Sequence, residues 1–234
     1  MDQPAPVIEE HKTYVLVTTV DKFDECNYFL AQMLREYHEP GTFRFNLNAF
    51  IQALRNVTFM LQSEEIKPPD FDAWYQQKQA EMREDNDLRC FVNARNLVVK
   101  QSMLEIRSIC HMGLFRGRRL KMAMGSPVPP CVSSRDYLEK IKNFAYGRFI
   151  DEGHSALGEQ IGVERIWLVQ ELGDGEVVDL CANALGKIGI LIQEAYALFG
   201  LHDFDPNVAL PDTRRFRVLL ETDVDPSLPE KWGW

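Results

Sequence analysis

The sequence VVDLCANALGKIGILIQEAYALF, residues 177–199, is the stretch that most clearly indicates the fold class. Its apolar residues recur at helical spacing and cover more than half of a helix circumference. We therefore expect a long helix at the centre of a helical bundle. Asp179, Lys187 and Glu194 interrupt the run, which makes it too polar to span a bilayer, so no contact with a membrane is expected.

The rest of the chain is predicted to complete this bundle. Apolar spacing and capping residues predict further helices at 21–37, 47–61, 71–82, 85–100, 133–149 and 161–172. Short extended segments are predicted at 13–19, at 215–220 and, as two weak strands, within 102–125. The expected fold is mainly α, a helical bundle of about six helices with a small β element.

The length of 234 residues favours a single domain, 1–234, with four parts. These parts are a helical core at 13–101, a basic and partly extended insertion at 102–130, C-terminal helices that complete the bundle at 131–200, and a Pro- and Asp-rich tail at 201–234. Trp232 and Trp234 end the tail and are costly to expose to water. We expect them to dock on the same chain or on a dimer mate.

The charge balance excludes a protein that coats nucleic acid or an anionic membrane by bulk charge. The chain has 26 Lys and Arg residues against 35 Asp and Glu residues, a formal net charge of -9. Segment 102–125 is an exception, with Glu105 as its one acid and five basic residues. We predict that Arg116, Arg118, Arg119 and Lys121 form an RNA-binding surface, and a solvated loop is the alternative.

The cysteines and histidines do not suggest a metal or a cofactor. The 5 cysteines are scattered without a C-x-x-C pair, and the histidines show no metal-ligand spacing. An odd number of dispersed cysteines is typical of a reducing compartment, and no secretory signal precedes them, so a cytoplasmic location is expected. His154 follows Glu152 and Gly153 and would act either as a base or as a structural residue.

A cation and an amide interrupt the apolar stripe of the predicted helix 85–100. Counting Leu88, Val92 and Val99 as the stripe places Arg95 on it and Asn96 beside it. Because burying unpaired polar groups costs about 1–3 kcal/mol each, and charged groups more, these two residues need either polar partners or a cleft.

The run Arg95–Lys100, with the sequence RNLVVK, resembles the signature of the HEPN (higher eukaryotes and prokaryotes nucleotide-binding) superfamily of helical bundles. The resemblance implies a metal-independent endoribonuclease that dimerises and acts in toxin–antitoxin, antiphage or stress systems. Arg95 would then hold the scissile phosphate, Asn96 would orient neighbouring groups, and Lys100 would occupy the position of the family's catalytic histidine. The implied partners are RNA, a second copy of the chain and an antitoxin-type protein.

Lys100 departs from the family pattern and supports a different function. Histidine titrates near neutral pH, whereas lysine stays protonated unless burial lowers its pKa, so Lys100 is a poor general base. The alternative is a non-catalytic interaction or structural protein built on a degenerate bundle of the same kind.

Both arginines near this run also have a structural alternative. Arg95 would form a salt bridge with an acid such as Glu64, Glu65 or Asp85 at a helix contact. Arg55, beside the stripe of the helix 47–61, would either share a phosphate-facing cleft with Arg95 or lie at the edge of the core with its stem buried.

Overall fold

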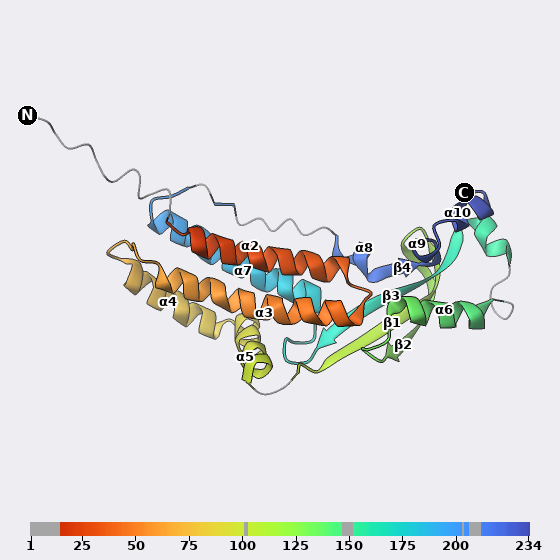
Figure 1. Ribbon diagram of the computed structural model, residues 1–234, viewed down its shortest axis with the longest axis horizontal. Coiled ribbons are helices and arrows are strands. Elements are labelled where there is room, and N and C mark those ends of the chain that lie inside the picture. The colour runs from red at the N-terminus through yellow and green to blue at the C-terminus, as the bar shows by residue number, and fades with distance from the viewer. Residues whose placement is uncertain (1–14, 101–102, 147–151, 203, 206–211) are drawn as a thin grey trace, which may run out of the picture.

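The structure is a computed structural model that describes residues 15–100, 103–146, 152–202, 204–205 and 212–234. Its described part is elongated, with a helical half and a sheet half that meet near the middle (Figure 1). The elements are α2 (Val17–Arg35), α3 (Pro40–Ser63), α4 (Phe71–Glu84), α5 (Asn86–Lys100), β1 (Ile106–Arg116), β2 (Arg119–Val128), α6 (Ser134–Ala145), η1 (Glu152–Leu157), β3 (Glu159–Val169), α7 (Val177–Leu198), α8 (Thr213–Arg217), β4 (Val218–Leu220), α9 (Glu221–Val224) and α10 (Leu228–Trp232).

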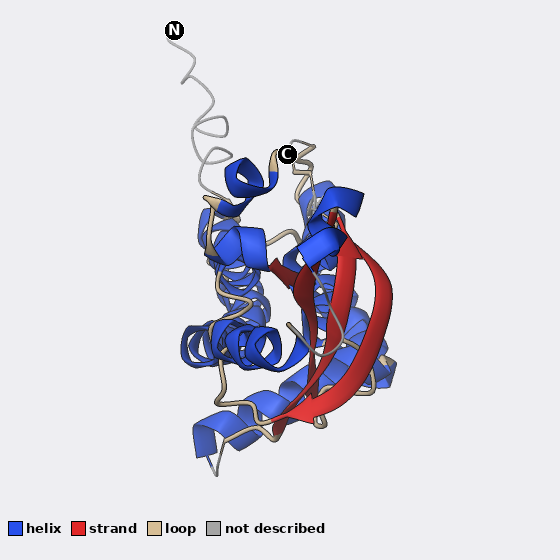
Figure 2. Cartoon of the chain, turned by 90° about the vertical axis from the view of Figure 1, so that its right-hand side faces the viewer, coloured by secondary structure: helices blue, strands red, loops and turns tan. Residues whose placement is uncertain are grey.

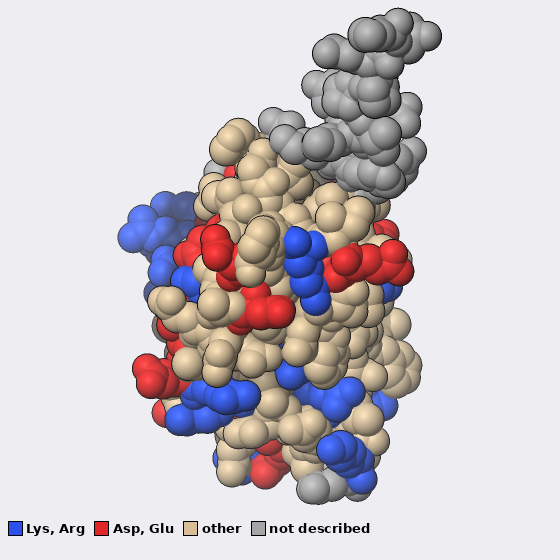
Figure 3. Space-filling view, turned by 90° about the vertical axis from the view of Figure 1, so that its left-hand side faces the viewer, with Lys and Arg blue, Asp and Glu red and all other residues tan. Residues whose placement is uncertain are grey.

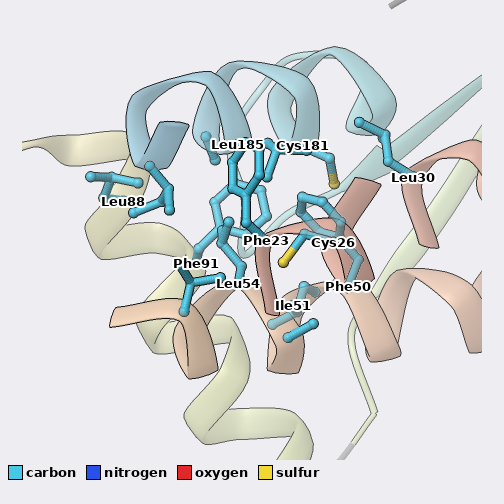
Figure 4. Close-up of a cluster of buried hydrophobic side chains, with 14 of the residues drawn as sticks. Phe23, Cys26, Leu30, Phe50, Ile51, Leu54, Leu88, Phe91, Cys181 and Leu185 are labelled. Atoms are coloured by element: carbon cyan, nitrogen blue, oxygen red, sulfur yellow. The ribbon is translucent and has the colours of Figure 1, made fainter. Parts of the chain in front are cut away.

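The helical half consists of α2, α3 and α7, with α4 and α5 packed against α3 and α7. α7 lies in the core because its apolar residues surround most of the helix, as the sequence pattern predicts. Phe23 and Cys26 of α2, Leu54 of α3 and Cys181 of α7 are buried in one cluster (Figure 4). Burying an aliphatic or aromatic side chain contributes about 1.5–3 kcal/mol, so this cluster is the main source of stability in the helical half.

The sheet half is a four-stranded antiparallel sheet with the strand order β2-β1-β3-β4 (Figure 2). α6 covers one face, where Leu138 and Ala145 pack on Cys110, Ile161 and Val163. On the opposite face a smaller cluster is formed by Phe115, Val218 and Leu220. Both faces of β1 and β3 therefore bury apolar side chains, although β2 remains an exposed edge.

The two halves are joined around Trp167 of β3. Its indole N–H donates to the carbonyl of Tyr37 at 2.9 Å, and its ring stacks on Phe43 with 4.8 Å between ring centroids. The hydroxyl of Tyr37 donates to Glu176 Oε1 and to the Arg165 carbonyl, both at 2.9 Å. Because these residues come from the turn between α2 and α3, from α3, from β3 and from the N-cap of α7, the contacts fix the bundle to the sheet.

Arg165 is fully buried at this joint and contacts uncharged acceptors. Its guanidinium donates to the Val132 carbonyl at 2.7 Å and to Ser108 Oγ at 3.0 Å, and it lies 3.8 Å from the centroid of the Trp167 ring. The adjacent His38 Nδ1 lies 2.9 Å from Ser134 Oγ. Burial, with the nearby charge of Arg165, lowers the pKa of His38 to about 4, so His38 is neutral at pH 7.

The C-terminal residues are fastened to the sheet by a buried carboxylate. Glu221 is 1% exposed and accepts hydrogen bonds from the Ile161 N–H at 2.7 Å and from the Tyr146 hydroxyl at 3.0 Å. The Tyr146 hydroxyl also lies 3.2 Å from Nε2 of the buried His154. Trp234 donates its indole N–H to the Ser155 carbonyl at 2.8 Å, so this tryptophan docks on the same chain, one of the two arrangements that we expected.

The expectation of a mainly α bundle of about six helices with a small β element is wrong. The part of the chain that the structure describes holds nine α-helices and a four-stranded sheet, which is a mixture of α and β. The main error lies in 161–172, predicted as a helix but forming β3 as far as Val169. Ile161, Val163, Trp167 and Val169 alternate as expected of a strand, but Arg165 interrupts the alternation.

Two smaller segments also differ from the prediction. Residues 17–19, expected to be extended, are the first turn of α2, because Leu16 and Thr19 are buried in the bundle. Residues 13–14 and 147–149, at the edges of predicted elements, lie outside the described residues. The strand predicted at 215–220 begins only at Val218, after α8, whereas the two strands predicted within 102–125 are confirmed as β1 and β2.

No helix in the described residues has both the length and the apolar character needed to cross a bilayer.

Candidate functional site: an arginine-rimmed pocket

A pocket of about 310 Å³ lies between α3, α4, α5 and α7. Its wall is apolar and is formed by Ile51, Leu54, Leu88, Phe91 and Ile188. α4 packs against α5, and α5 packs against α3, so residues of the three helices line one opening.

Three arginines from three different helices stand at this pocket. Arg55 of α3 donates to Thr58 Oγ1 at 2.8 Å and lies 4.2 Å from the centroid of the Phe59 ring. Arg89 of α5 donates to Asn86 Oδ1 at 2.7 Å, and Arg83 is at the end of α4. Among the described residues, none of the three forms an ion pair with a carboxylate. Their charges are therefore available to an anion.

Two acids close to these arginines in sequence are engaged with a lysine. Asp85 and Asp87 accept from Lys187 of α7 at 2.6 and 2.7 Å. Burial acts to raise the pKa of Asp85, but hydrogen bonds from Lys187 and from the Leu88 N–H outweigh it and hold the pKa below its usual value. These two ion pairs thus lie on the α7 side of the α4–α5 corner and do not involve Arg83 or Arg89. Figure 3 shows Lys and Arg side chains on the lower part of this end of the molecule, with Asp and Glu side chains among them.

The structure places Arg95 and Asn96 about one turn beyond Val92, the last residue of α5 at the pocket. The residues of α5 that face the core are Leu88, Phe91 and Ala94, whereas Val92 is 38% and Val99 is 48% exposed. After Leu88, the stripe on which we placed Arg95 therefore turns away from the core. Arg95 is half-buried and donates to Asn96 Oδ1 at 3.4 Å.

The structural alternatives predicted for Arg95 and Arg55 compare differently with the structure. No ion pair joins Arg95 to an acid in the described part of the chain; Glu64 instead accepts from Thr19 at 2.6 Å. Arg55 and Val92 both line the pocket. Val92 precedes Arg95 by three residues, so the two lie on the same side of α5. Lys100 is exposed at the end of α5. The catalytic roles of Arg95, Asn96 and Lys100 stay predictions.

The basic residues of segment 102–125 lie in the other half of the molecule, on the β1–β2 hairpin (Figure 1). Arg116 pairs with Glu159 at 3.1 Å, and Arg118 pairs with Asp223 at 2.7 Å. Arg119 and Lys121 are exposed. The structure therefore does not bring the predicted RNA-binding residues together with Arg55. Their RNA-binding role also stays a prediction.

Sequence reasoning missed Arg83 and Arg89, which complete the rim of the pocket. Both are exposed helical arginines, and no spacing within one helix connects them to Arg55, because the three meet only when α3, α4 and α5 pack together. In the described residues no group of three or more His, Cys, Asp or Glu side chains is arranged to hold a metal ion.

Comparison with known proteins corrects the expected family. A family model described as bacteriophage lambda protein ea47 matches residues 11–216. Protein ea47 of Escherichia phage lambda is 32% identical over 88 residues, which are 37% of this chain and 22% of that protein, so the match spans about a fifth of the relative's length. No solved structure matches the chain. The resemblance to the HEPN superfamily, and with it the ribonuclease and toxin–antitoxin assignments, is wrong because the matching family is a different one.

Proposed function

The chain belongs to the family of bacteriophage lambda protein ea47, and on this premise we propose that it is a non-catalytic interaction protein whose arginine-rimmed pocket binds an acidic segment of a partner protein. One observation supports this proposal: the pocket combines an apolar wall with three arginines. Among the described residues, these arginines have no carboxylate partner. A segment with a carboxylate next to an apolar side chain matches both features.

The arginines and the apolar wall would contribute similar free energies to binding. A hydrogen bond to a charged group contributes about 1.5–3 kcal/mol, and burying one aliphatic side chain contributes a similar amount. Arg55 is already held by Thr58 and by the Phe59 ring, so its side chain loses less freedom on binding than a mobile lysine would. One carboxylate and one apolar residue would together give a specific though modest affinity.

Several observations favour a protein segment over RNA as the ligand. Single-stranded nucleic acid is usually bound by a long positive groove with exposed aromatic rings. Here Arg55 lies against the ring of Phe59, the exposed aromatic residue nearest to it in sequence, and the hairpin residues Arg116 and Arg118 are paired with acids of the same chain. The net charge of -9 also opposes binding to a polyanion except at one local site.

The chemistry of the pocket supports binding rather than catalysis. The described histidines lie outside α3, α4 and α5, and arginine does not exchange protons near neutral pH. The 5 cysteines are unpaired, which is typical of proteins in a reducing compartment, so the proposal places the protein in the cytoplasm.

The test is a fluorescence-polarisation titration with a labelled helical peptide of Leu and Glu residues. A peptide with Gln in place of Glu, and a single-stranded RNA oligonucleotide, serve as alternative ligands. We expect Arg89→Glu to weaken binding of the acidic peptide at least tenfold, equivalent to about 1.4 kcal/mol. Arg135→Glu makes the same charge change on the exposed surface of α6 and should leave the affinity unchanged.

Two results would overturn the proposal. Equal peptide affinity in wild type and Arg89→Glu would show that the pocket is not the binding site. Tighter binding of RNA than of the acidic peptide, lost in Arg89→Glu, would instead assign the arginines to phosphate recognition.

A further inference from the structure

The outer edge of β2 carries exposed apolar side chains next to an unpaired strand. Among the described residues, β2 pairs with β1 alone and is the first strand of the sheet order. Met122 is 64% exposed and Met124 is 63% exposed. An edge strand of this kind presents a row of backbone N–H and C=O groups that can pair with another strand.

The two methionines lie on the face of the sheet that α6 covers further inward. Met122 pairs with Leu114 and Met124 pairs with Met112, so all four side chains point to the same face. Tyr137 of α6 reaches Met112, with 3.9 Å between its hydroxyl and the sulfur atom. α6 packs over β3 and β1, so the apolar face continues past the helix to β2 without cover.

We propose that β2 pairs with β2 of a second copy of this chain, antiparallel and with the two-fold axis at Ala123. In this register Met122 lies opposite Met124 of the second copy, and the reverse pair lies on the other side of the axis. The result is a continuous eight-stranded sheet in which four methionines meet between the two α6 helices. Methionine suits this position because its flexible, polarizable side chain adapts to an apolar contact.

The charges of β2 are compatible with this register. Lys121 lies opposite Gly125 of the second copy, so no lysine faces a like charge across the new pair. A centre near Leu120 would instead bring Lys121 opposite Arg119 of the second copy. Pro127, which cannot donate a backbone hydrogen bond, lies outside the pairing segment 121–125. A centre at Ala123 therefore avoids like charges and also places Met122 and Met124 opposite each other in both cross-strand pairs.

The first test is the mass of the full-length protein in solution, measured by sedimentation at increasing concentration. We expect a dimer that dissociates in the double variant Met122→Lys and Met124→Lys, with a dissociation constant raised at least tenfold, because four added charges would meet in the dimer. The matched control is Arg135→Lys and Lys140→Arg on α6, which should leave the dimer intact. A wild-type monomer at all concentrations, or a dimer unchanged in the methionine variant, would overturn the proposal.

The second test locates the axis by cross-linking in a Cys131→Ser background, which removes the exposed native thiol. Opposed residues of an antiparallel pair have Cβ atoms about 4.5–5.5 Å apart, close to disulfide geometry. Under mild oxidation Ala123→Cys should form a covalent dimer much faster than Ala31→Cys, which places a thiol on the exposed side of α2. Equal rates for the two variants would contradict an axis at Ala123.

Discussion

Replacement of Glu221 by alanine should destabilise the protein by about 3–5 kcal/mol. The carboxylate accepts from the Ile161 N–H at 2.7 Å and from the Tyr146 hydroxyl at 3.0 Å, and it is 1% exposed. A hydrogen bond to a charged group contributes about 1.5–3 kcal/mol, and the Ile161 N–H would be left buried without its acceptor. Lys142 Nζ, 3.9 Å away, would also lose its nearest buried charge.

The measurement is urea denaturation at pH 7, followed by tryptophan fluorescence and by circular dichroism. Glu221→Gln keeps an acceptor for both donors while it removes the charge, so it should cost about half as much as alanine. This second variant keeps the comparison possible if the alanine variant does not fold. A free energy of unfolding within about 1 kcal/mol of wild type in Glu221→Ala would refute the reasoning that this carboxylate fastens the C-terminal elements to β3.

Two further predictions concern the joint and the hairpin. The pKa of His38 is lowered from 6.5 to about 4 in the fold, so the unfolded chain binds the extra proton, and stability should fall as the pH drops through this interval. The loss attributable to His38 is up to about 3 kcal/mol, and denaturation of wild type and His38→Gln at pH 7 and 4.5 should show a smaller decrease in the variant. Gly113→Ala should destabilise by at least about 2 kcal/mol in thermal melts, because the added Cβ would lie 1.7 Å from the Met122 carbonyl oxygen. Gly41→Ala, whose Cβ meets nothing within 4 Å, should be neutral or slightly stabilising, and equal melting temperatures for the two variants would contradict this account.

The helices were predictable where one face of each is consistently apolar. Leu47, Phe50 and Leu54 of α3 are buried in the structure, although α3 begins at Pro40, before the predicted start at residue 47. α7 is central for the reason that its sequence indicates. The strand β3 was not predictable from alternation alone, because Arg165 occupies a position that an apolar residue would normally fill. Its burial depends on Trp167, Ser108 and the Val132 carbonyl, which the fold brings together from separate segments.

The candidate site was only partly visible in the sequence. Arg55 was identified as an edge residue near a possible cleft, and the structure places it at the pocket. Arg83 and Arg89 could not be identified, since an exposed arginine on a polar helix has no distinguishing local pattern. Whether Arg83 and Arg89 can bind an anion depends on which nearby acids pair with other residues. Asp85 and Asp87 pair with Lys187, about a hundred positions away in the sequence, and no local pattern indicates this pairing.

The chain crosses the joint between the two halves repeatedly, and this path affects how the protein folds. α2 and α3 are neighbours in sequence and can form a hairpin early. α7 packs against them as well, but β1, β2, α6 and β3 separate it from them along the chain. Closing so long a loop carries an entropic cost before the core contacts form, and non-local contacts of this kind slow folding. Neither half is one continuous segment, so no single cut would release a half that retains all its elements.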